Sequence, residues 1–266
     1  MPTDSRDRAF RGLLVLLIAA GGFFGLAPLV FPTQFADASG FSGRDVFMYR
    51  IAGAATFGYA VGLASGFRSG WAAIRIPIAS TCVFNAASIV ACAVAIIGGG
   101  AQPVVYLILL ASVLFTASTG YFLASPPGQG ASGAPAGSAG GSDMAPWVIG
   151  LFAIGTAAAA FFGVAALIPA GAFGHLLGYS GMDDFVYRQG GAATLGAAVG
   201  GAMVLMSRRW EAARIPARMA LTFNGLSVVA AVLEITSGGQ PIAWLILVAA
   251  GLVTIGSAAA IARGGR

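Results

Sequence analysis

Two Tyr-Arg pairs, Tyr49-Arg50 and Tyr187-Arg188, are the residues whose types and spacing best suit the binding of a charged ligand. Each pair lies about one turn inside an apolar segment, and ionisable side chains in membrane segments usually face the protein interior. Two guanidinium groups that face each other can bind one anionic group through paired hydrogen bonds. In the alternative interpretation, both arginines extend to the membrane surface or form internal salt bridges.

Three other polar residues, Asn85, Asn224 and Glu234, fall within apolar segments. A polar side chain at the depth of the two asparagines either hydrogen-bonds to a neighbouring helix or lines a polar path. Glu234 is expected at about the depth of Arg50 and Arg188. It either pairs with one of them, which removes an isolated charge from the membrane, or lies exposed among the lipid headgroups.

The composition excludes several kinds of chemistry. All 14 basic residues are Arg, so no lysine can form a Schiff base with a cofactor or complete a Walker A phosphate loop. The single histidine, His175, and the two cysteines, Cys82 and Cys92, do not make up a haem or metal site, and the cysteines are too far apart on one expected helix to form a disulfide. We therefore predict no catalytic, cofactor-binding or metal-ligating residue, and no cofactor.

These side chains must be positioned by membrane-spanning helices. Of the 266 residues, 58% are hydrophobic and 9% charged, and the mean hydropathy is +0.88, whereas about 25% of the residues in a soluble domain are charged. Apolar runs of about 20 residues, the length that crosses a bilayer, predict eight helices. They are residues 12–32, 46–66, 77–97, 103–124, 146–169, 185–206, 216–236 and 241–262. The predicted fold class is an all-α polytopic membrane protein.

The chain also repeats itself after 138 or 139 residues: Tyr49-Arg50 returns as Tyr187-Arg188, and Asn85 returns as Asn224. We predict two four-helix repeats, residues 1–124 and 146–266, joined by a flexible linker at 125–145 that is rich in Gly, Pro, Ser and Ala. Because each repeat has an even number of spans, the two are parallel, and a pseudo-twofold axis along the membrane normal should relate them.

Two motifs in each repeat have structural interpretations. Ser42-x-x-Asp45 and Ser180-x-x-Asp183 fit the capping box at a helix start, with the acid in the first turn. In each repeat, Trp, Arg and Pro also precede the third span, with the proline expected at the start of the helix. These residues are Trp71, Arg75 and Pro77 in the first repeat and Trp210, Arg214 and Pro216 in the second.

The distribution of arginine predicts the orientation. Eleven of the 14 arginines lie on the side of the spans that carries both termini, and only Arg44, Arg50 and Arg188 lie on the other. The positive-inside rule therefore places both termini in the cytoplasm, in a multi-pass protein of the cell (inner) membrane. The same rule accounts for the net charge of +5 without a nucleic-acid partner.

Two functions from different classes remain open. The first is a small-molecule carrier, pore or ligand-binding protein with a site between the repeats near the outer leaflet, where Arg50, Arg188 and their polar neighbours contact an anionic small molecule. The alternative is a non-transporting accessory or assembly subunit, whose Gly-rich helix faces contact a membrane-protein partner. A membrane enzyme is disfavoured, because the sequence offers neither a nucleophile with a base nor a paired acid and base, although Glu234 and Asp183 remain as isolated carboxylates.

Overall fold

The structure is a computed structural model that describes residues 5–99, 101–127, 142–179, 181 and 183–266, and these residues form ten helices. Eight of the helices are long and apolar enough to cross a membrane. They are α1 (Ser5–Val30), α3 (Val46–Gly66), α4 (Trp71–Ile97), α5 (Pro103–Ala124), α6 (Pro146–Leu167), α8 (Asp184–Ser207), α9 (Trp210–Thr236) and α10 (Ile242–Ala262). The prediction of an all-helical protein with eight long apolar helices is confirmed.

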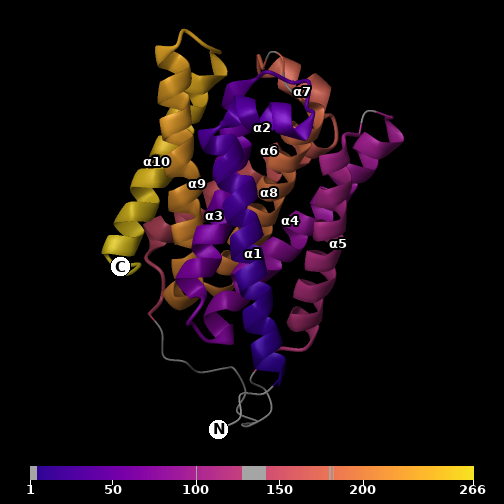
Figure 1. Ribbon diagram of the computed structural model, residues 1–266. Coiled ribbons are helices and arrows are strands. Elements are labelled where there is room, and N and C mark those ends of the chain that lie inside the picture. Colours follow the sequence, from indigo (N-terminus) through magenta and orange to yellow (C-terminus); the bar gives the residue numbers. More distant parts are fainter. Residues whose placement is uncertain (1–4, 100, 128–141, 180, 182) are drawn as a thin grey trace.

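The two remaining helices, α2 (Pro32–Ser39) and α7 (Ala170–Leu176), are short and were not predicted. Proline occupies the first turn of α2, and Gly40 ends the helix in the left-handed conformation, with φ of 74°. In Figure 1 both short helices lie at the upper end of the bundle, whereas α1 begins and α10 ends at the lower end. We call these the α2/α7 end and the terminal end.

The starts of the spans differ from the prediction in two ways. Asp45 and Asp183 are the N-caps of α3 and α8 themselves, so the capping boxes predicted from Ser42 and Ser180 were misplaced by three residues. Asp45 Oδ1 accepts the Met48 N–H at 3.0 Å, and Asp183 Oδ1 accepts the Phe185 N–H at 3.0 Å. These bonds satisfy free N–H groups at the start of each helix.

The third span of each half is longer than predicted. Helices α4 and α9 begin at Trp71 and Trp210, so Pro77 and Pro216 lie inside the helices and do not start them. The apolar pattern missed these first turns because Arg75 and Arg214 interrupt it, and both arginines are exposed.

The two halves of the chain interlock. Helices α3 and α8 contact each other, and each also packs on the helix before it in its own half, α3 on α1 and α8 on α6. On the other side, α3 packs mainly on α9 and α8 mainly on α4, so each packs against a long helix of the opposite half (Figure 1). The outer helices α5 and α10 pack on α4 and α9.

Glycines allow these close approaches. A Cβ atom added to Gly25 of α1 would lie 2.6 Å from the Phe57 backbone nitrogen of α3, and one added to Gly163 of α6 would lie 2.8 Å from that of Leu195 in α8. A Cβ on Gly58 of α3 would lie 3.1 Å from the Met219 carbonyl oxygen of α9. These small-residue faces are therefore occupied by the chain's own helices.

Backbone hydrogen bonds tie the two halves together at the α2/α7 end and hold the end of the linker on the second half at the terminal end. At the α2/α7 end, the N–H groups of Arg44 and Asp45 donate to the Gly181 carbonyl at 2.7 and 3.1 Å. At the terminal end, the Met144 N–H donates to the Arg208 carbonyl at 3.0 Å. Most of the predicted flexible linker, residues 128–141, lies outside the described residues, but its last four residues are described and Met144 is bonded in this way.

Candidate functional site

Two cavities lie on opposite sides of the α3/α8 pair. The larger, which we call the α6–α10 pocket, has a volume of about 360 Å³ and is lined mainly by α3, α6, α8, α9 and α10. The smaller, the α1–α5 pocket, has a volume of about 130 Å³ and is lined mainly by α1, α3, α4, α5 and α8. The larger volume is within the range of about 300–1,000 Å³ that is typical of ligand pockets.

The α6–α10 pocket opens sideways, on the outer surface of the bundle. Phe162 of α6 and Leu245 of α10 both line it, and they are 38% and 53% exposed. At the terminal end the same two helices meet: Leu151 packs on Gly256, and the Trp147 indole N–H donates to the Arg266 carbonyl at 3.3 Å. The opening therefore faces the region that a bilayer would occupy.

The pocket is elongated. Its lining extends along α10 from Ile242 to Ser257, about 22 Å at 1.5 Å per residue. This length fits an extended chain better than a compact molecule.

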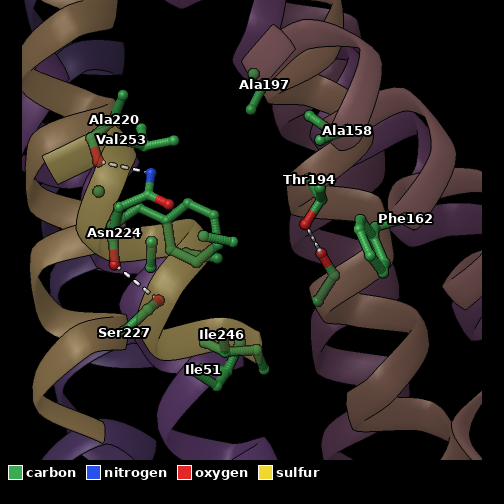
Figure 2. Close-up of a pocket in the computed structure, with 18 of the residues that line it drawn as sticks. Ile51, Ala158, Phe162, Thr194, Ala197, Ala220, Asn224, Ser227, Ile246 and Val253 are labelled. Atoms are coloured by element: carbon green, nitrogen blue, oxygen red, sulfur yellow. Dashed lines mark hydrogen bonds between the residues drawn. The ribbon is translucent and has the colours of Figure 1, made fainter. Parts of the chain in front are cut away.

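The lining is apolar, with a few neutral polar groups. The Asn224 Nδ2 and Ser227 Oγ of α9 donate to the carbonyls of Ala220 and Phe223, each at 2.8 Å, and the Thr194 Oγ1 of α8 donates to the Gly190 carbonyl at 2.7 Å. Figure 2 shows these groups on opposite walls of the pocket. Because their donors are used within their own helices, the oxygen atoms remain as acceptors. No charged side chain is among the described residues that line the pocket.

In the α1–α5 pocket, one polar side chain crosses between helices. Gln189 of α8 accepts a hydrogen bond from Ser88 Oγ of α4 at 2.8 Å, and its amide nitrogen lies 3.8 Å from the Cys92 sulfur. Thr56 and Asn85, which also line this pocket, donate to carbonyls of their own helices at 3.0 and 2.8 Å. The expected interhelical role of Asn85 is therefore taken by Ser88 and Gln189.

Aromatic rings close the bundle at the α2/α7 end. Phe41 packs on Phe185 with ring centroids 5.6 Å apart, and Tyr179 packs on Phe47 at 6.2 Å. Tyr179 also contacts Tyr187 at 5.5 Å. Burial raises the pKa of Tyr179, so its hydroxyl stays neutral. Tyr179 and Tyr187 both line the α6–α10 pocket, at its α2/α7 end.

The structure brings together only some of the predicted site residues. Tyr187 and Asn224 line the larger pocket and Asn85 lines the smaller one. Four others line neither pocket: Tyr49, Arg50, Arg188 and Glu234.

The expected ion pair between Glu234 and an arginine does not form among the described residues. Arg188 instead pairs with Asp184, one turn earlier in α8, at 3.7 Å. Glu234 Oε1 accepts the backbone N–H of Gln240 at 3.0 Å and so holds the turn between α9 and α10. Arg50 is half-buried, and the described part of the chain gives it neither a hydrogen bond nor an ion pair.

Asp45 is the most deeply buried carboxylate of the α2/α7 end, with 4% exposure. Burial raises its pKa above 3.8, and the nearby Glu234 carboxylate raises it further. Hydrogen bonds from Gln240 and the Met48 N–H oppose the shift. Asp45 therefore has a higher affinity for a proton in the folded protein than in the unfolded chain.

Sequence reasoning missed Thr56, Thr194 and Gln189 as pocket residues. The signal for the threonines was available, because Thr56 returns as Thr194 after 138 residues. No comparable signal marks Gln189, whose equivalent in the first half is Ile51.

Comparison of the chain with protein families, with curated proteins and with solved structures found no match.

Proposed function

We propose that this protein binds the hydrocarbon chain of a neutral lipid in the α6–α10 pocket, as a lipid carrier or a lipid-binding protein of the membrane. The observation that carries the proposal is an elongated, apolar pocket of about 360 Å³ that opens sideways between two membrane helices. A ligand dissolved in the bilayer can enter there without crossing water. Tyr179 and Tyr187 supply neutral hydroxyl groups near one end of the chain.

The electrostatics of the pocket favour a neutral ligand over the anion expected from the sequence. An anion inside a membrane protein needs a cationic partner, because an isolated charge in that environment costs several kcal/mol. Neither Arg50 nor Arg188 lines the pocket, and Arg188 is paired with Asp184.

Binding of an anionic molecule by Arg50 remains the second candidate, because Arg50 is half-buried and has no ion pair within the described residues. A site at this residue would be separate from the α6–α10 pocket. Flux of an anionic solute that survives in Arg50→Gln would remove this candidate.

We also infer that the two halves, residues 1–124 and 146–266, are parallel repeats. Matching contacts made by equivalent residues, which lie 138 or 139 positions apart in sequence, support this. Gly58 packs on Phe223, and its equivalent Gly196 packs on Phe84, which is the equivalent of Phe223. The arginine distribution then supports a cytoplasmic terminal end in the cell (inner) membrane.

The accessory-subunit alternative is weakened by the same contacts. The Gly-rich faces that were expected to bind a partner contain Gly58, Gly62 and Gly196, and all three pack against helices of this chain. A partner would need another surface.

A photoactivatable diacylglycerol, with a diazirine in one acyl chain, tests the proposal. In purified protein reconstituted in vesicles, we expect the label on peptides from α6 and α10. Ala249→Trp places a large ring in the pocket and should abolish labelling. Val248→Trp, at the adjacent residue, which is 60% exposed and does not line the pocket, is the matched control and should label normally. Unlabelled wild-type protein, or equal labelling of both variants, would overturn the proposal.

A further inference from the structure

We infer that the α1–α5 pocket is a second copy of the lipid site, closed by larger side chains, so that each protein molecule binds one lipid chain. This inference rests on the proposed function. It adds the number of lipid chains bound per protein molecule. It also identifies a closed second site for the same class of neutral lipid, and the residues that keep this site closed.

The two pockets have equivalent polar residues. Thr56 and Asn85 line the α1–α5 pocket, and their equivalents Thr194 and Asn224 line the α6–α10 pocket. All four donate to the carbonyl four residues earlier in their own helix, at 2.7 to 3.0 Å. The shared positions and the shared hydrogen bonding indicate one site that occurs twice.

The volumes nevertheless differ, about 130 against 360 Å³. Larger residues line the α1–α5 pocket at several equivalent positions. Leu17 and Leu63 stand where the other pocket has Gly155 and Gly201. These larger side chains occupy space along α1 and α3 that the hydrocarbon chain of a lipid would need.

Tyr59 is the largest of these differences. Its ring packs on Phe84 with centroids 5.1 Å apart, and its hydroxyl donates to the Ala193 carbonyl at 2.7 Å, so the ring is fixed between the two pockets and lines both. The equivalent residue, Ala197, presents only a methyl group to the larger pocket. The equivalent of Ala193 is Ala55, so a tyrosine at position 197 would have a matching carbonyl acceptor.

Gln189 closes the smaller pocket from α8. Its side chain bridges to Ser88 of α4 at 2.8 Å. The equivalent residue in the larger pocket is Ile51, and the equivalent serine, Ser227, bonds within its own helix at 2.8 Å. The larger pocket therefore lacks this bridge between helices.

Exchange of equivalent residues tests the inference with the same diazirine-labelled diacylglycerol. Wild-type protein should be labelled on α6 and α10 but not on α1 or α5. Ala197→Tyr, which copies the closed pocket, should lose the label. Tyr59→Ala with Gln189→Ile, which copies the open pocket, should gain a second label on α1 or α5. Because Tyr59 makes a buried hydrogen bond and also lines the α6–α10 pocket, Leu17→Ala with Phe115→Val serves as a second opening variant that retains Tyr59 and leaves the lining of the larger pocket unchanged.

Each outcome decides the inference. A second label in either opening variant, or loss of the label in folded Ala197→Tyr, supports it. Wild-type protein labelled on both faces overturns it, as do folded variants that all keep the wild-type pattern, and in these cases the proposed function stands. Wild-type protein labelled on neither face overturns the inference together with the proposed function.

Discussion

At the residue scale, Asp45 and Asp183 have the same role in different surroundings. Each caps a helix, but Asp45 is buried near Glu234 and Gln240, whereas Asp183 is partly exposed. The sequence predicted that the two acids belong to helix starts, because Ser-x-x-Asp precedes an apolar run in both halves. It did not predict the burial of Asp45, which depends on the distant turn between α9 and α10.

The raised pKa of Asp45 predicts a pH effect on stability. The folded protein holds this proton at pH values where the unfolded chain has lost it, so stability falls as the pH rises above about 4. Asp45→Asn keeps a capping oxygen and removes the titration. We expect the melting temperature of the variant, relative to wild type, to increase between about pH 4.5 and about pH 7.5. An unchanged difference across this range would contradict the assignment.

The cap at Asp183 predicts a loss of stability when its side chain is removed. Its carboxylate accepts the N–H groups of Phe185 and Val186 at 3.0 and 3.3 Å. Asp183→Ala should lower the free energy of unfolding by about 1 kcal/mol, whereas Asp183→Asn should restore most of it. Reversible unfolding in mixed detergent micelles measures both. Equal losses in the two variants would argue against a capping role.

At the scale of the helices, the sequence predicted the spans well and their ends poorly. All eight spans were identified, because about 20 apolar residues are sufficient evidence for a membrane helix. The helices α2 and α7 were missed because a helix of seven or eight residues carries too little periodicity. The starts of α4 and α9 were missed because Arg75 and Arg214 interrupt the apolar pattern in the first turns of these helices.

The close contact of α1 with α3 predicts the effect of one added methyl group. Gly25→Ala forces the Phe57 backbone away from α1. This substitution should lower the free energy of unfolding by about 1–3 kcal/mol. Gly22 lies three residues earlier on α1, and a Cβ added there would meet no atom of a neighbouring helix within 4 Å, so Gly22→Ala should be neutral or slightly stabilising. Melting temperatures of the two variants in one detergent make the comparison. A Gly25→Ala protein as stable as wild type would show that α1 and α3 separate easily.

At the scale of the whole molecule, the repeat predicted which residues are equivalent but not which of them meet. The expectation of paired arginines near an axis was reasonable from the sequence, because Arg50 and Arg188 occupy equivalent positions. The structure places cavities on both sides of the α3/α8 pair, lined by Asn85 and Asn224, and neither arginine lines them. Pairing across helices depends on packing angles, which the sequence does not specify.

The interlocked halves predict that a divided chain will reassemble. When the chain is broken between residues 128 and 141, each fragment retains four spans, but α3 and α8 lose their main partners in the opposite half. Co-expressed fragments should therefore co-purify through a tag on one of them. A fragment expressed alone should be degraded or aggregate. Recovery of stable, separate fragments would contradict the packing of α3 on α9 and α8 on α4.

The proposed parallel arrangement predicts the location of the termini. Reporters fused to the two ends of the chain should both be active on the cytoplasmic side, because the number of spans is even and most arginines lie at the terminal end. A periplasmic C-terminus would exclude eight spans with the proposed orientation.

The packing of α3 on α9 can form only late in the synthesis of the chain. Gly58 meets Met219, which follows it by 161 positions in the chain, so a ribosome working at about 5–20 residues per second needs about 10 to 30 s to supply the contact. During that interval the glycine face of α3 has only lipid or an insertion chaperone beside it. Newly made protein is thus most vulnerable to quality-control proteases after α3 has emerged and before α9 has been made.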